Sequence, residues 1–136
     1  MKIMFTARAT ATGGRSGTTS LDDGSMSLNT AMPGSGQPGV NPEQLFAMGY
    51  AACFDNAVIM LARQQKKALQ GSQTSVQVGL GQAEAGGYGL DIDLYVEVRG
   101  LPEAEAQALV AAAHQICPYS NAVRGNVDVR LHVTVA

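Results

Sequence analysis

The chain has 136 residues, of which 46% are hydrophobic and 15% charged, and its formal net charge is −2. This composition is typical of a folded protein and excludes a disordered chain. A slight negative charge without clustered lysine or arginine argues against binding to nucleic acid or to an anionic membrane surface. We therefore expect a single domain over residues 1–136 with neither kind of partner.

Several stretches alternate apolar and polar side chains with a period of two, which predicts strands with one buried face. They are residues 2–12, a short strand from Thr18, and residues 25–29, 76–80, 90–98 and 127–135. Glycine-rich turns follow the first of them and join residues 76–80 to 90–98 as a hairpin. On the polar faces, we expect Asp93 to point outward and His132 to be solvated.

A long helix is expected to begin at Asn41-Pro42-Glu43, because Asn suits the N-cap, Pro the first position and Glu the first turn. From there to about Lys67 the sequence is apolar nearly all round, which predicts a buried helix. The apolar stretch 45–61 falls short of a membrane span, and Gly49 offers a point where the helix can break in two.

A second helix is predicted over residues 102–116, where Pro118 ends it. The order of strands, buried helix, strands, helix and strand favours an α+β fold with antiparallel sheets. A helix as apolar as the first needs more cover than the strands of one small chain supply. We therefore expect an extensive homodimer interface.

The chain contains two cysteines, Cys53 and Cys117, without a Cys-x-x-Cys motif or a histidine spacing typical of structural zinc. We find no signal peptide and expect a cytoplasmic protein, where permanent disulfides are unusual. In that compartment the two cysteines are either inert core residues or redox-active thiols. Composition leaves both readings open.

A lone buried cysteine such as Cys53 is most often a core residue. Its neighbours are small, however, and the polar pair Asp55-Asn56 follows it. If the helix breaks at Gly49, the helix dipole would favour a thiolate at Cys53. Cys117 ends its helix beside Pro118, where a thiol can move; this feature alone is equally compatible with no role.

Arg15 lies in a glycine-flanked turn, and most arginines in turns are simply solvated. Glu43 fits a helix N-terminus, but it can also orient a guanidinium through two parallel hydrogen bonds. His114 shares a helix face with Cys117, so a Cys–His acyl-transfer enzyme is one alternative. Packing or ordinary hydrogen bonding is the simpler role for His114.

Four segments resemble the organic hydroperoxide resistance proteins, in the family that includes the osmotically inducible protein C. They are residues 6–15, 41–47, 49–54 and 113–122. The stretch Cys117-Pro118-Tyr119-Ser120-Asn121 is the most specific of them, and the likeness covers nearly the whole chain. The chain departs from the family pattern at Ser16, where an acidic residue is common, and at Asp55, where an apolar residue is frequent.

The resemblance implies a thiol-dependent peroxidase acting on alkyl and fatty-acid hydroperoxides. It implies an intertwined homodimer in which two antiparallel β-sheets wrap around long central helices. It assigns the peroxidatic role to Cys53, the resolving role to Cys117, and an ion pair to Arg15 and Glu43. The resemblance also implies that the protein needs no cofactor. Its reductant would be an external dithiol, on a lipoylated protein or as dihydrolipoamide.

The chemistry of such a site follows from the acidity of thiols. A free thiol has a pKa of about 8.5, so little thiolate exists at neutral pH unless a cation such as Arg15 stabilises it. An apolar pocket around Phe46, Met48 and Phe54 would favour an alkyl tail. A peroxide sensor using the same cysteines without turnover is a further alternative, although no DNA-binding element is visible.

Overall fold

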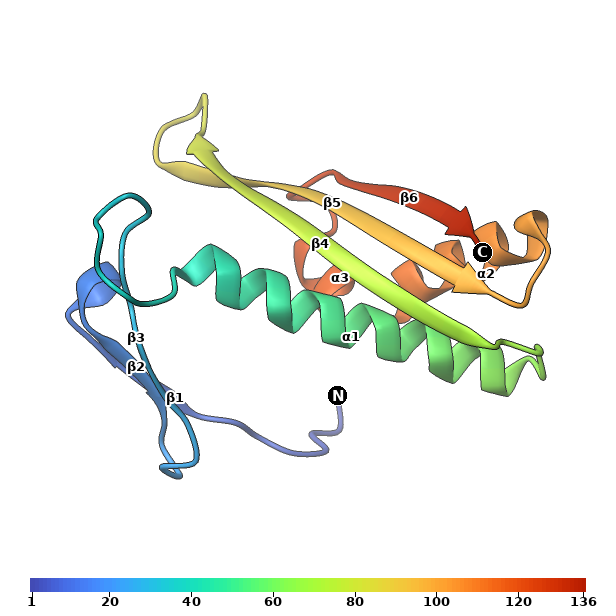
Figure 1. Cartoon of the computed structure of the whole chain (residues 1–136), viewed down its shortest axis with the longest axis horizontal. Coiled ribbons are helices and arrows are strands. Elements are labelled where there is room, and N and C mark those ends of the chain that lie inside the picture. Colours follow the sequence, from blue (N-terminus) through green and yellow to red (C-terminus); the bar gives the residue numbers. More distant parts are fainter. The chain divides into compact units, whose positions relative to one another are not determined.

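The computed structural model describes residues 1–136, and the chain divides into two compact units, Met1–Leu45 and Phe46–Ala136. Strands and helices alternate in groups along the chain (Figure 1), which confirms the predicted α+β class. The expectation of a single domain stays a prediction.

The first unit contains a three-stranded antiparallel sheet in the order β1-β2-β3. Its strands are β1 (Ala9–Thr12), β2 (Thr18–Leu21) and β3 (Ser27–Asn29). The prediction of a strand from residue 2 was wrong for residues 2–8, which have no regular structure. Ile3 and Phe5 are exposed, so the alternating pattern there has no surface within the chain to cover.

Short turns join the strands of this unit, and the glycine-rich turn after β1 was predicted. The turn after β2 is closed by a hydrogen bond from the Gly24 N–H to the Leu21 carbonyl at 3.0 Å. Between β1 and β2 the chain makes a short 3₁₀ helix, η1 (Gly14–Ser16), which carries Arg15. The loop after β3 returns to pair Thr30 with Val40 immediately before the long helix.

Helix α1 covers Pro42–Gln64 and confirms the predicted N-terminus. The Asn41 Oδ1 accepts the Gln44 N–H at 2.8 Å, and the Gln44 Oε1 accepts the Asn41 N–H at 2.9 Å. This reciprocal cap satisfies two backbone donors that would otherwise lack partners. The helix is continuous through Gly49, so the predicted break was wrong.

By length and composition α1 could cross a membrane, since its most apolar window has a mean hydropathy of 1.6. Helix α1 is longer than the apolar stretch 45–61, which alone was expected to fall short of a span. The core helix of a soluble protein passes the same test. Here α1 contributes Tyr50, Phe54 and Val58 to the protein core, and all three are fully buried.

The second unit contains the sheet β4-β5-β6. Its strands are β4 (Gly71–Gln82), β5 (Tyr88–Arg99) and β6 (Val129–Val135). The predicted hairpin is confirmed by the antiparallel pairing of β4 with β5. In contrast, β5 and β6 are parallel, so the expectation of purely antiparallel sheets was wrong. The helical segment between them is the crossover that a parallel pair requires.

This crossover contains α2 (Glu103–Ile116) and α3 (Pro118–Val123). Helix α2 confirms the predicted second helix, and its buried residues are Ala106, Leu109, Val110 and Ala113. Pro118 ends α2 as expected, but it also occupies the first turn of α3, a position that its fixed φ angle suits. Helix α3 was not predicted from the sequence.

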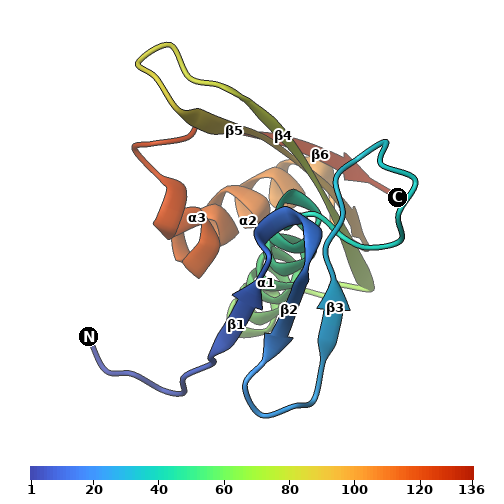
Figure 2. The same cartoon turned by 90° about the vertical axis from the view of Figure 1, so that its left-hand side faces the viewer.

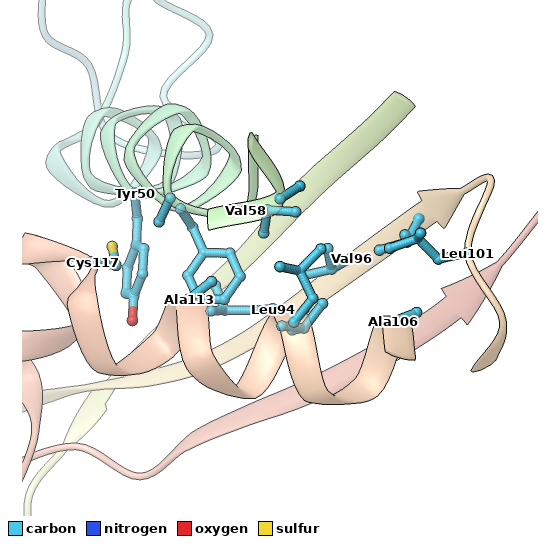
Figure 3. Close-up of a cluster of buried hydrophobic side chains, with 14 of the residues drawn as sticks. Tyr50, Val58, Leu94, Val96, Leu101, Ala106, Ala113 and Cys117 are labelled. Atoms are coloured by element: carbon cyan, nitrogen blue, oxygen red, sulfur yellow. The ribbon is translucent and has the colours of Figure 1, made fainter. Parts of the chain in front are cut away.

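Helices α1 and α2 cover one face of the second sheet (Figure 2), and their apolar side chains meet those of β5 in one core (Figure 3). Ile92, Leu94, Val96 and Val98 form the sheet's side of this core and are at most 1% exposed. These four residues alternate along β5 and share one face of the strand. They give the helices a continuous apolar surface on which to pack.

The opposite face of this sheet carries a cluster of charged and aromatic side chains. Asp93 points to that face as predicted, but it is only 7% exposed, because Arg130 and His132 cover it. The hydrogen bonds from Arg130, and then that from His132, hold the pKa of Asp93 well below its usual range. His132 is exposed, as predicted, and it also stacks on Tyr95 at 4.6 Å between ring centroids.

Candidate active site

The two predicted thiols meet in the second unit. Cys53 lies in the middle of α1, and Cys117 lies at the corner between α2 and α3. The Cys117 thiol donates a hydrogen bond to the Cys53 sulfur across 3.5 Å, and neither cysteine is disulfide-bonded. Cys117 is fully buried, whereas Cys53 is partly exposed. Two residues distant in sequence are therefore close enough to form a disulfide after a small movement.

The surroundings of Cys53 within this unit oppose ionisation. Burial is the main reason that the pKa of the Cys53 thiol is raised, and the neighbouring Cys117 raises it further. A backbone hydrogen bond from Tyr119 acts in the opposite direction. None of these groups is a cation. The helix-dipole hypothesis was also wrong, since α1 does not begin a new helix near Cys53.

Gly49 lets the corner that carries Cys117 pack closely on α1. A Cβ atom at this position would lie 2.7 Å from the Tyr119 hydroxyl oxygen, which is too close for any real contact. The Tyr119 ring packs beside Tyr50 and Phe46, with ring centroids 5.7 and 6.0 Å away. The glycine in α1 thus provides space for an aromatic ring instead of a helix break.

A buried hydrogen-bonded chain fixes the same corner. The Tyr50 hydroxyl and the Ser120 Oγ are 2.6 Å apart, and the Ser120 Oγ lies 2.8 Å from the His114 Nδ1. Arg124 donates to the His114 carbonyl and to the Asn121 Oδ1. Burial, and to a lesser degree Arg124, lowers the pKa of His114, which favours its neutral form. These bonds fit the simpler role expected for His114 and argue against a Cys–His acyl-transfer pair.

Asp55 has a structural partner on the neighbouring strand. Its Oδ1 accepts hydrogen bonds from the Ser72 hydroxyl at 2.9 Å and the Thr74 hydroxyl at 3.0 Å. Both hydroxyls belong to β4, so this carboxylate joins α1 to the sheet. The polarity that follows Cys53 in the sequence therefore reflects helix–strand packing.

Arg15 and Glu43 form the predicted ion pair in the first unit. The Arg15 Nη1 donates to the Glu43 Oε2 and its Nη2 donates to the Oε1, both at 2.7 Å. This two-bond geometry fixes the plane of the guanidinium. The Arg15 hydrogen bonds are the main reason that the pKa of Glu43 is lowered, and they raise the pKa of Arg15.

The residues expected to line an apolar pocket have different environments. Phe46 is half-buried against Tyr50 and Tyr119, and Met48 is 57% exposed. Phe54 is fully buried in the core, so it does not line an open pocket. Tyr119, which was not expected to line the pocket, is 38% exposed beside the thiols.

Residues 34–132 match the family model described as OsmC-like protein. The chain therefore belongs to the OsmC-like protein family. Within this family it is 48% identical to the organic hydroperoxide resistance protein of Xanthomonas axonopodis pv. citri, over 96% of this chain and 94% of that protein. It is 46% identical to OhrB of Bacillus subtilis, over 96% of this chain and 98% of that protein.

Solved structures agree with this assignment. An organic hydroperoxide resistance protein from Legionella pneumophila superposes with a TM-score of 0.94 at 46% identity, covering 98% of this chain and 100% of that one. A putative one from Vibrio cholerae gives a TM-score of 0.92 at 44% identity, covering 98% and 94%. The chain thus falls in the organic hydroperoxide resistance branch, which supports a role in detoxifying organic hydroperoxides.

Replacing Ser120 with alanine should destabilise the protein by about 2 kcal/mol, because the buried Tyr50 hydroxyl and the His114 Nδ1 both lose their partner. Tyr50→Phe, which keeps the Ser120–His114 bond, should cost only about 1 kcal/mol. Urea unfolding of the three proteins measures both values. Equal stability of Ser120→Ala and the parent chain would show that the buried chain of hydrogen bonds contributes nothing.

Proposed function

We propose that this protein is a thiol-dependent peroxidase that reduces alkyl and fatty-acid hydroperoxides to alcohols. The observation that carries the proposal is the 3.5 Å approach of the Cys53 and Cys117 sulfur atoms. A pair in which one thiol is partly exposed and the other buried suits a cycle with one attacking and one resolving thiol. Membership of the organic hydroperoxide resistance branch supports the choice of substrate class.

In the first step the Cys53 thiolate attacks one peroxide oxygen and the O–O bond breaks. The sulfur is oxidised to a sulfenic acid, while the second oxygen leaves as an alkoxide that takes up a proton to become the alcohol. Cys53 is assigned this step because it is the more accessible of the two thiols.

In the second step the Cys117 sulfur attacks the Cys53 sulfenic acid. A sulfur–sulfur bond forms, the S–O bond breaks, and the hydroxyl leaves with the Cys117 proton as water. A resolving thiol already 3.5 Å away traps the sulfenic acid before a second peroxide can oxidise it further.

Arg15 supplies the positive charge that Cys53 lacks in its own unit. Burial raises the pKa of the Cys53 thiol, so a useful thiolate concentration at neutral pH requires a cation nearby. The two-bond pair with Glu43 keeps the Arg15 guanidinium oriented. In this proposal the same guanidinium stabilises the alkoxide that leaves.

An external dithiol of the lipoyl type, on a protein or as dihydrolipoamide, returns the disulfide to two thiols and becomes a cyclic disulfide itself. Captopril, which carries a thiol, occupies one of the active sites of the Vibrio cholerae relative. No cofactor resident in the protein is needed for this exchange. The cycle suits a reducing compartment, and we propose a cytoplasmic location.

We also propose that the protein is an intertwined homodimer. Only 33% of the most apolar window of α1 is buried, and Met48, Ile59 and Met60 on this helix are 57%, 38% and 40% exposed. The unpaired apolar residues before β1, which carry a strand pattern, add further surface for a second copy to cover.

The dimer predicts a solution mass of twice the 14.1 kDa chain by light scattering. Met60→Glu should shift this mass towards one chain, because a carboxylate would be buried in the interface. Met60→Leu keeps the apolar surface and should remain dimeric. A parent protein that is monomeric at micromolar concentration would exclude the dimer.

Cys53→Ser should abolish consumption of cumene hydroperoxide with dihydrolipoamide, since serine cannot form a sulfenic acid. Cys117→Ser should reduce one equivalent of peroxide and then gain further oxygen at Cys53, seen as added mass. Sustained turnover by Cys53→Ser would rule out the assigned nucleophile. A parent protein that is oxidised once and does not turn over with the dithiol would point to the sensor alternative.

Arg15→Ala should raise the pKa of Cys53, because the thiolate loses the cation that stabilises it. The fraction of thiolate at pH 7 then falls by about tenfold for each unit of the rise. The pH dependence of iodoacetamide labelling at Cys53 measures this shift. Arg15→Lys, which keeps the charge but not the planar fork, should have a smaller effect; labelling curves that coincide for all three proteins would remove the electrostatic role.

A further inference from the structure

We propose that Thr30 is a positioning residue that holds the turn carrying Arg15 in the conformation in which Arg15 meets Glu43. The inference rests on the proposed role of Arg15 at Cys53. Thr30 lies outside the four segments that resemble the family.

The Thr30 side chain holds the Arg15 turn at both ends. Its hydroxyl accepts the Gly17 N–H at 2.8 Å and donates to the Gly14 carbonyl at 2.8 Å. The Thr30 N–H donates in turn to the Gly17 carbonyl at 2.9 Å. Three hydrogen bonds from one residue therefore bracket Arg15, and the hydroxyl uses both its donor and an acceptor position.

The turn itself has little intrinsic preference for its shape. Gly13 and Gly14 adopt φ angles of 83° and 58°, and a backbone bond from the Ser16 N–H to the Gly13 carbonyl spans 3.1 Å. Glycines permit these angles but also leave the unrestrained chain many others. An external restraint is therefore needed to keep Arg15 in one place.

Thr30 is well placed to supply that restraint. It is only 8% exposed, and its neighbours pair with the strand-like segment before α1. The Ala31 N–H donates to the Val40 carbonyl at 3.1 Å, and the Val40 N–H donates to the Asn29 carbonyl at 2.9 Å. Val40 lies just before the helix turn that carries Glu43. Thr30 thus links the turn that carries Arg15 to the segment that precedes Glu43.

The test uses Thr30→Val, which keeps the shape of the side chain and removes its hydroxyl, with Thr30→Ser as the matched control. The valine variant should lower kcat/KM for cumene hydroperoxide roughly tenfold, as expected for two lost hydrogen bonds, and raise the pKa of Cys53. The serine variant should restore both. Parent-like kinetics in Thr30→Val would overturn the proposal.

A double variant separates positioning from general stability. If Thr30 acts through Arg15, adding Thr30→Val to Arg15→Ala should cause no further loss of kcat/KM. The same fractional loss in both backgrounds would mean that Thr30 acts by another route, and would reject the positioning role.

Amide hydrogen exchange at Gly17 tests the restraint without reference to catalysis. Its N–H should exchange faster in Thr30→Val than in the parent and in Thr30→Ser, because its acceptor is gone. Unchanged exchange would reject the restraint itself. If Arg15→Ala leaves the Cys53 pKa unaltered, the electrostatic part of the proposed function fails, whereas faster Gly17 exchange would still support the restraint.

Discussion

The close packing of the α2–α3 corner on α1 determines what the second unit can do chemically. Gly49 leaves room for the Tyr119 ring, and the Ser120 hydroxyl bonds to the buried Tyr50. Together these contacts bring the Cys117 sulfur to 3.5 Å from that of Cys53. Because protein interiors are close-packed, a larger side chain at position 49 would have to displace the Tyr119 ring.

The same packing also creates an electrostatic difficulty. Removing a thiol from water favours its neutral form, and the pKa of Cys53 is raised accordingly. Bringing two cysteines together therefore does not by itself provide a useful amount of Cys53 thiolate at neutral pH. In the proposed mechanism the missing positive charge comes from Arg15, whose guanidinium plane is set by the Glu43 carboxylate.

Much of this architecture could be predicted from the sequence. Periodicity located the hairpin and α2, the capping residues and a long apolar stretch located α1, and the family resemblance predicted the Arg15–Glu43 pair. The helix α3 was missed because six residues are too few to show a period. Alternation does not encode strand direction, so parallel β6 was unexpected. Thr30 acts through hydrogen bonds to distant backbone atoms, and such contacts leave no pattern in a single sequence.

The parallel pairing of β5 with β6 has a consequence for the position of Cys117. No tight turn joins these strands, so cross-strand side chains must fix their alignment. Asp93 faces Arg130 and Tyr95 faces His132, and a slip by one residue would turn the two basic side chains into the apolar core. The cluster on the solvent side of the sheet therefore anchors the far end of the segment that carries the resolving cysteine.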